Sequence, residues 1–157
     1  MDQLKTEFLF DVKAELRDPN LIIGSMPEGM RMVAHVSGGT FEGPKLKGTL
    51  AASGGDWALV RADGSVKIDV RTVLMAEDGT NIYVTYGGRI LMKPEQMGAL
   101  GDRKAAAALD PATYYFRTNP LFEVAMDSPH AWLNNVVAVG VGSLTEAGVS
   151  YRIYEVK

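Results

Sequence analysis

Two Asp-Gly dipeptides, Asp63-Gly64 and Asp78-Gly79, each lie between runs rich in valine, isoleucine and tyrosine. Asp-Gly favours the two-residue type I′ hairpin turn, because both central residues of that turn need positive φ. Two such turns predict a three-stranded antiparallel meander from about residue 56 to residue 86. The register of the two turns then decides which side chains share a face of the sheet.

The rest of the chain is also typical of short strands. Residues 4–16 and 30–36 alternate between apolar and polar side chains, and four further runs at 114–118, 121–126, 132–144 and 149–156 are typical of closing strands. The stretch KPEQMGALGDRKAAAALDP predicts one short helical segment near residues 94–109. About eight to ten strands at even spacing indicate an all-β sandwich or closed barrel. We expect one domain over residues 1–157.

Register arithmetic places charged side chains on a single face of the meander. With two-residue loops, paired residue numbers sum to 127 in the first hairpin and to 157 in the second. Arg71 then lies opposite both Asp56 and Tyr86, and Asp69 lies on the same side. The same face continues with Val73, Met75, Ile82 and Val84. The opposite face, more apolar still, carries Trp57, Leu59, Val66, Ile68, Val70, Leu74 and Tyr83.

Because neither face is polar throughout, the strands must be covered on both sides, as in a barrel whose inner face lines a cavity. Apolar walls with a few convergent polar groups are typical of a ligand site. The alternative is that Asp56 and Arg71 form a structural ion pair at the rim of the sheet, worth only about 0.2–1 kcal/mol if exposed.

Composition limits the possible partners and cofactors. The net charge of -3 gives no basic footprint for nucleic acid. There are no cysteines and two histidines, too few for a multi-histidine metal site, so we expect no metal and no cofactor. The N-terminal segment has no long apolar run, which favours a cytoplasmic protein without a membrane partner. GxSxG, HExxH, P-loop and GxGxxG motifs are absent.

Four further residues are candidates for a binding site. His35 shares the polar phase of its strand with Arg31 and suits a surface or barrel-lining position better than a general base. Arg117 could bind a carboxylate or enolate at the barrel mouth, or simply end a strand. Trp132 and Asn134 are expected on one face of a strand, where a buried asparagine needs a partner in the protein or a ligand.

Several motifs resemble those of the bacterial and fungal family known as domain of unknown function 3237, or uncharacterised protein family 0311. They are GGTFEGPKLKGTL, GGDW, RADG, DVRTVL, DGTNIYVTYGG, YFRTNPLFE and WLNNVVAVGVG. The resemblance runs from Phe8 to Val156. It implies a lipocalin-like or streptavidin-like antiparallel β-barrel with a central cavity, often assembled as a homo-oligomer, and cofactor-free chemistry on small aromatic or polyketide molecules. The family's recurring positions match Asp56, Trp57, Arg61, Asp69, Arg71, Arg117, Trp132 and Asn134.

The leading hypothesis from the sequence is a cofactor-independent isomerase, cyclase or lyase acting on a small aromatic or polyketide-like molecule. Asp56 or Asp69 would transfer the proton, and Arg71, helped by Tyr86 or Arg117, would stabilise an oxyanion. Trp132, Asn134 and His35 complete the expected substrate-binding set. The alternatives are a non-catalytic lipocalin-like protein that binds a small hydrophobic ligand, and an oligomeric accessory protein whose cavity is filled by its own side chains.

Overall fold

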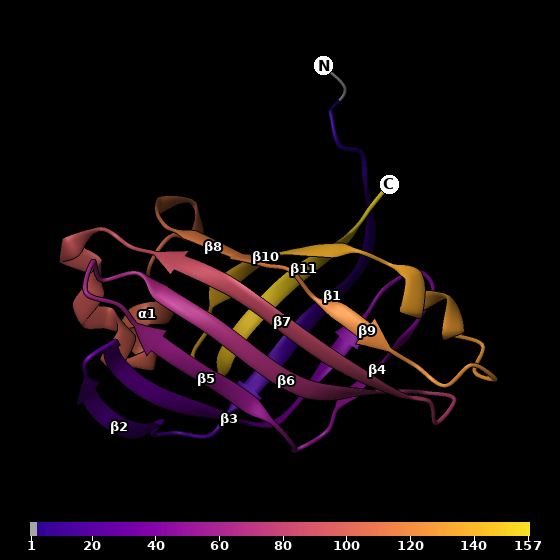
Figure 1. Ribbon diagram of the computed structural model, residues 1–157, viewed down its shortest axis with the longest axis horizontal. Helices are drawn as coiled ribbons and strands as arrows, with labels where there is room; N and C mark the ends of the chain where they lie inside the picture. The colour runs from indigo at the N-terminus through magenta and orange to yellow at the C-terminus, as the bar shows by residue number, and fades with distance from the viewer. Residues whose placement is uncertain (1–2) are drawn as a thin grey trace.

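The computed structural model describes residues 3–157. Eleven β-strands dominate it, with one short α-helix and three 3₁₀ segments (Figure 1). The strands are β1 (Thr6–Leu16), β2 (Leu21–Met26), β3 (Gly29–Glu42), β4 (Lys47–Leu50), β5 (Gly55–Val60), β6 (Val66–Ala76), β7 (Asn81–Leu91), β8 (Tyr115–Thr118), β9 (Leu121–Glu123), β10 (Ala138–Leu144) and β11 (Gly148–Val156). The helical segments are η1 (Pro94–Gly101), α1 (Arg103–Ala107), η2 (Pro111–Thr113) and η3 (Ala131–Asn135).

Eight of these strands close into an antiparallel barrel. The order around it is β6-β5-β3-β1-β11-β10-β8-β7, and the pairing of β7 with β6 completes the circle. Strand β2 pairs with β3 outside this ring, β4 pairs with β3 and β6, and β9 pairs with β7. The all-β barrel class expected from the sequence is therefore confirmed, and so is the helical segment near residues 94–109, which is divided between η1 and α1.

The meander is confirmed, but its register is shifted by one residue in both hairpins. Val60 lies opposite Val66, so paired residue numbers sum to 126 and not 127. Val66 lies opposite Ile90, which gives 156 and not 157. The cause is the turn: the Asp63 carboxylate accepts a hydrogen bond from the Ser65 N–H at 2.9 Å, and only Gly64 has positive φ. Asp63 therefore lacks the positive φ that the first central residue of a type I′ turn requires.

The two ends of the barrel are closed by different segments. Figure 1 shows α1 beside one end, and the orange-yellow coil that contains η3 at the other. The predicted strand at 132–144 is wrong in its first part, because Trp132 and Asn134 lie in the 3₁₀ segment η3 and the strand begins only at Ala138. Between the two ends the interior is packed with apolar side chains, among them Phe10, Phe41, Phe116 and Ile82.

Candidate functional site

The alternation of buried and exposed side chains along β6 identifies the inner face of the barrel. Its even-numbered residues, such as Ile68 and Val70, are buried, whereas Lys67, Asp69 and Arg71 are exposed. Pairing joins even residues to even residues across β5, β6 and β7. Asp56 and Tyr86 therefore face the interior. The predicted grouping of Asp69 and Arg71 with them on one face is wrong, because a one-residue shift moves every side chain of β6 to the other side.

Asp56 lies at the wall of a largely apolar cavity, called here the inner chamber. This space of about 90 Å³ is also lined by Met32, Ala34, Leu100 and Arg103. Burial of the carboxyl group raises the pKa of Asp56 from 3.8 to about 6, and the nearby negative charge of Asp69 adds to the rise. A hydrogen bond from the Asp69 N–H to the Asp56 Oδ1, at 2.9 Å, acts in the opposite direction. Desolvation of the charged form is the dominant cause.

The hydrogen bond from Asp69 to Asp56 coincides with a gap in the β5–β6 ladder. Pairing runs from Gly55 to Asp56, omits Trp57 and Ala58, and resumes at Leu59. The carbonyl oxygen of Trp57 accepts instead from the Arg31 Nη1 at 2.7 Å. The Asp56 carboxylate thus takes the place of a backbone acceptor, which fixes its position between the two strands.

Two phenols, the buried Tyr151 and the partly buried Tyr86, lie near Asp56 and are called here the tyrosine pair. The rings of Tyr86 and Tyr151 are 5.5 Å apart between centroids, in an edge-to-face arrangement. Burial raises the pKa of both phenols above the ordinary value of 10, and the Asp56 charge contributes to the rise. Both side chains are therefore neutral hydrogen-bond donors near pH 7. They line a second, apolar cavity of about 30 Å³, which shares no lining residue with the inner chamber.

A wider space, called here the outer cleft, adjoins the inner chamber. It has a volume of about 380 Å³ and is lined mainly by the connection between β1 and β2, by β3 and by η1, with Ile22, Met30 and Met97 among its walls. Four residues line both the cleft and the chamber, and together they are called here the collar: Asn20, Met32, Leu100 and Arg103. A ligand entering from the cleft would pass the collar before it reached Asp56.

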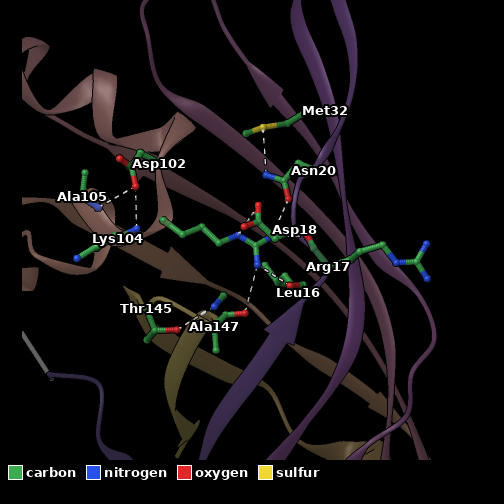
Figure 2. Close-up of polar contacts among 12 residues, drawn as sticks. Leu16, Arg17, Asp18, Asn20, Met32, Asp102, Lys104, Ala105, Thr145 and Ala147 are labelled. Atoms are coloured by element: carbon green, nitrogen blue, oxygen red, sulfur yellow. Dashed lines mark hydrogen bonds and ion pairs between the residues drawn. The ribbon is translucent and has the colours of Figure 1, made fainter.

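Arg103 fastens α1 to the barrel mouth. Its guanidinium donates hydrogen bonds to the carbonyl oxygens of Leu16, Arg17 and Ala147, and to the Asn20 Oδ1 at 3.1 Å. Figure 2 shows the Asn20 amide directed toward Met32. The Arg103 side chain is 19% exposed, and its Nε lies 3.8 Å from the Asp18 carboxylate. These bonds tie the helical segment to strand ends far away in the sequence.

The other predicted site residues lie outside the chamber. Asp69 and Arg71 form an exposed ion pair at 3.7 Å, and the Arg71 guanidinium lies 5.9 Å from the Trp57 ring centroid. His35 is on the opposite phase of β3 from the chamber-lining Ala34. Arg117 lies over the Tyr115 ring on the outer surface.

Trp132 and Asn134 lie in η3, at the end of the barrel away from α1 (Figure 1). Asn134 joins η3 to the chain after β9: its Oδ1 accepts from the Val124 N–H, and its Nδ2 donates to the Val124 carbonyl, each at 2.8 Å. The sequence predicted a buried amide here, but Asn134 is exposed, and its partners are backbone groups of the protein. The Lys45 ammonium lies over the Trp132 ring, 5.2 Å from its centroid.

Sequence reasoning missed Tyr151, Asn20 and Arg103. The alternation of β11, in which Tyr151 and Ile153 are buried and Arg152 is exposed, is a signal that could have identified Tyr151. Asn20 and Arg103 are separated by 83 residues, and no local pattern joins them. Within residues 3–157, His, Asp and Glu side chains form no group of three that could hold a metal ion. None of the helices in this part of the chain is long and apolar enough to cross a membrane.

The chain is similar to proteins of known sequence and structure. A family model described as "Protein of unknown function (DUF3237)" matches residues 4–156. A UPF0311 protein of Clostridium acetobutylicum is 27% identical over 154 residues, covering 98% of this chain and 95% of that protein. A β-barrel-like protein from Acinetobacter baumannii is 33% identical with a TM-score of 0.83, covering 100% and 98% of the two chains. A structure described as an enzyme from Penicillium herquei, 24% identical with a TM-score of 0.70 over 100% and 97%, shares the fold.

Proposed function

The chain belongs to the DUF3237 family, and from the geometry of its barrel we propose that it is a cofactor-independent acid/base enzyme of the isomerase, cyclase or lyase type. Its substrate is a small aromatic or polyketide-like molecule bound at the barrel mouth. The observation that carries this proposal is a carboxyl group, Asp56, at the wall of a largely apolar chamber and near enough to the tyrosine pair for its charge to act on both phenols. Apolar surroundings strengthen both proton transfer and the stabilisation of developing charge.

Asp56 is suited to move a proton in both directions. With a pKa of about 6, its carboxylate form dominates at pH 7, and its protonated form is accessible during turnover. In an isomerisation, Asp56 would take a proton from a substrate carbon beside a carbonyl group and return it to another atom, with no net change in protons. A phenol of the tyrosine pair would donate a hydrogen bond to the enolate oxygen that develops between these two steps, which requires the substrate arm to extend from the chamber toward the second cavity. This role was assigned to Arg71 from the sequence, but Arg71 faces outward.

Proton transfer can be tested directly by solvent-deuterium exchange. The protein is incubated in D₂O with a panel of bicyclic aromatic ketones, 2-acetylnaphthalene first, and exchange of the hydrogens beside the carbonyl is followed by NMR. We expect wild-type protein to accelerate exchange and Asp56→Asn to lower the enzymatic rate by about 10²–10⁴-fold. Asp69→Asn, which removes the outward-facing neighbouring carboxylate, is the matched control and retains exchange. Equal rates for wild type and Asp56→Asn would exclude Asp56 as the proton-transfer group.

A second candidate function is a non-catalytic small-molecule binding protein. The engagement of the Asp56 Oδ1 by the Asp69 N–H favours it, because an acceptor already used by the backbone is a weaker base. In that case the ketones would bind stoichiometrically and their exchange rates would equal those in buffer. The third alternative was an accessory protein whose cavity is filled by its own side chains. The middle of the barrel is filled in this way, but the inner chamber and the outer cleft are open.

A further inference from the structure

The collar contains one side chain with an underused hydrogen-bond donor. Arginine can only donate, so the Asn20 atom that faces Arg103 must be the Oδ1, and this fixes the amide orientation. The Asn20 Nδ2 is thereby directed at the Met32 sulfur, 3.9 Å away. A thioether is a weak acceptor, so an oxygen atom of a ligand would be the better partner for this group.

Arg103 itself is not available to a ligand. Its two terminal nitrogens are engaged by three carbonyl oxygens and by Asn20, and its Nε faces Asp18. Arg103 is therefore a positioning residue that acts through Asn20. The polar group that the collar offers to a ligand is therefore the Asn20 amide N–H, which lies between the apolar side chains of Met32 and Leu100.

The sizes of the two spaces on either side of the collar limit what can bind. A cavity of roughly 150 Å³ can hold a benzene ring, and the inner chamber, at about 90 Å³, is smaller. The outer cleft, at about 380 Å³, is within the range of small-molecule sites. Its walls include Met30, Met32 and Met97, whose flexible, polarisable side chains suit aromatic rings.

We propose that Asn20 is the specificity-determining residue of this site, and that it donates a hydrogen bond to an acceptor oxygen of the substrate as that oxygen passes the collar. The substrate class follows from the two volumes: an apolar body of about two fused rings lies in the outer cleft, and a short arm bearing a carbonyl-type oxygen enters the inner chamber. This inference rests on the proposed function for the role of the arm, which presents its reactive carbon to Asp56.

The test uses two probes that differ only in the acceptor atom. In 2-acetylnaphthalene the arm carries C=O, and in 2-isopropenylnaphthalene the same position carries C=CH₂. Binding is measured at pH 7.5 by NMR of protein labelled with ¹³C in the methionine methyl groups. Both probes should shift the Met30 and Met97 signals of the outer cleft and leave Met126, which is 94% exposed elsewhere, unchanged. Wild-type protein should bind the ketone about two- to twelvefold more tightly than the alkene, as one net hydrogen bond allows.

Two variants remove the donor in different ways. Asn20→Asp keeps an acceptor for Arg103 but replaces the amide with a carboxylate, and Asn20→Leu removes both polar atoms. The ketone preference should fall to about onefold or below in both. Asn81→Asp, an equal change of charge on an exposed residue at the start of β7, is the matched control and should retain it. An unchanged preference in the two Asn20 variants, probe shifts that avoid Met30 and Met97, or absence of binding would each overturn the inference.

The binding preference separates this inference from the proposed function. Asp56→Asn should lower deuterium exchange by about 10²–10⁴-fold yet keep the ketone preference, because Asn20 is intact. Loss of the preference in Asn20→Leu with no effect of Asp56→Asn on exchange would support the collar and refute the catalytic role. The reverse pattern would refute the collar alone.

Discussion

The Asp56 carboxyl group should make the stability of the protein fall as pH rises, contrary to the usual behaviour of acidic residues. Its pKa is raised from an ordinary 3.8 to about 6, so the folded protein binds this proton more tightly than the unfolded chain does. The corresponding stabilisation is fully present below about pH 4 and is lost as pH rises through 6. At 1.36 kcal/mol per pH unit, the difference between the two values corresponds to about 3 kcal/mol.

Asp56→Asn isolates this contribution. The amide has nearly the same shape, keeps an acceptor for the Asp69 N–H, and carries no charge at any pH. The free energy of unfolding in urea is measured for both proteins from pH 4 to pH 8. All other titrating groups are shared and largely cancel in the difference. Relative to wild type, the variant should gain about 2–3 kcal/mol between these limits, with most of the change between pH 4 and 6.

The result that would refute this reasoning is a difference that stays constant over the pH range. Such a result would mean that Asp56 has the same pKa in both states, and hence that water or a conformational change solvates its carboxylate. A difference that changed with the opposite sign would indicate that the Asp69 N–H and the Arg31 charge outweigh burial. Either result would also weaken the proposal that Asp56 is a proton carrier near neutral pH.

Three further predictions concern the scaffold. Asn134→Ala removes the clamp on both backbone groups of Val124 and should lower the free energy of unfolding by about 2–4 kcal/mol in urea titrations; a loss below about 1 kcal/mol would argue against the clamp. Asp69→Asn breaks an exposed pair with Arg71, removes a negative charge near Asp56, and should change stability by less than about 1 kcal/mol in the same assay, so a larger loss would contradict its surface position. Gly64→Ala, at a φ of +82°, should cost about 1 kcal/mol or more by thermal unfolding, whereas Gly98→Ala, which meets open space, should not.

The strands were predictable because their signal is local. Alternation over residues 4–16 and 30–36 corresponds to β1 and to the first part of β3. Residues 132–135 misled the prediction because apolar residues there also suit a strand. The Asn134 side chain bonds to the Ala131 carbonyl and to Val124, and such local bonds compete with a strand ladder. Closure into a barrel depends on pairings between distant segments, and the strand pattern alone left a sandwich equally open.

The collar could not have been predicted from the sequence. Asn20 follows a Pro in a short connection, and Arg103 begins a five-residue helix. Their contact exists because α1 is folded back over the barrel mouth, where the Leu16 and Ala147 carbonyls leave acceptors for a guanidinium. Each residue alone has the appearance of an ordinary polar surface residue, and only the tertiary contact gives the Asn20 amide a defined direction.

The register error affected one strand and spared its neighbours, for a geometric reason. Each hairpin is shifted by one residue, which inverts β6 relative to β5 and again relative to β7. Two inversions cancel, so β5 and β7 keep the relative phase that the sequence predicted. Asp56 and Tyr86 therefore remain on one face, while Asp69 and Arg71 leave it. The same aspartate-captured turn in both hairpins, with Ser65 and Thr80 donating to Asp63 and Asp78, makes the two shifts equal. An Asp-Gly pair followed by Ser or Thr should accordingly be counted as a three-residue loop when the faces of a meander are assigned.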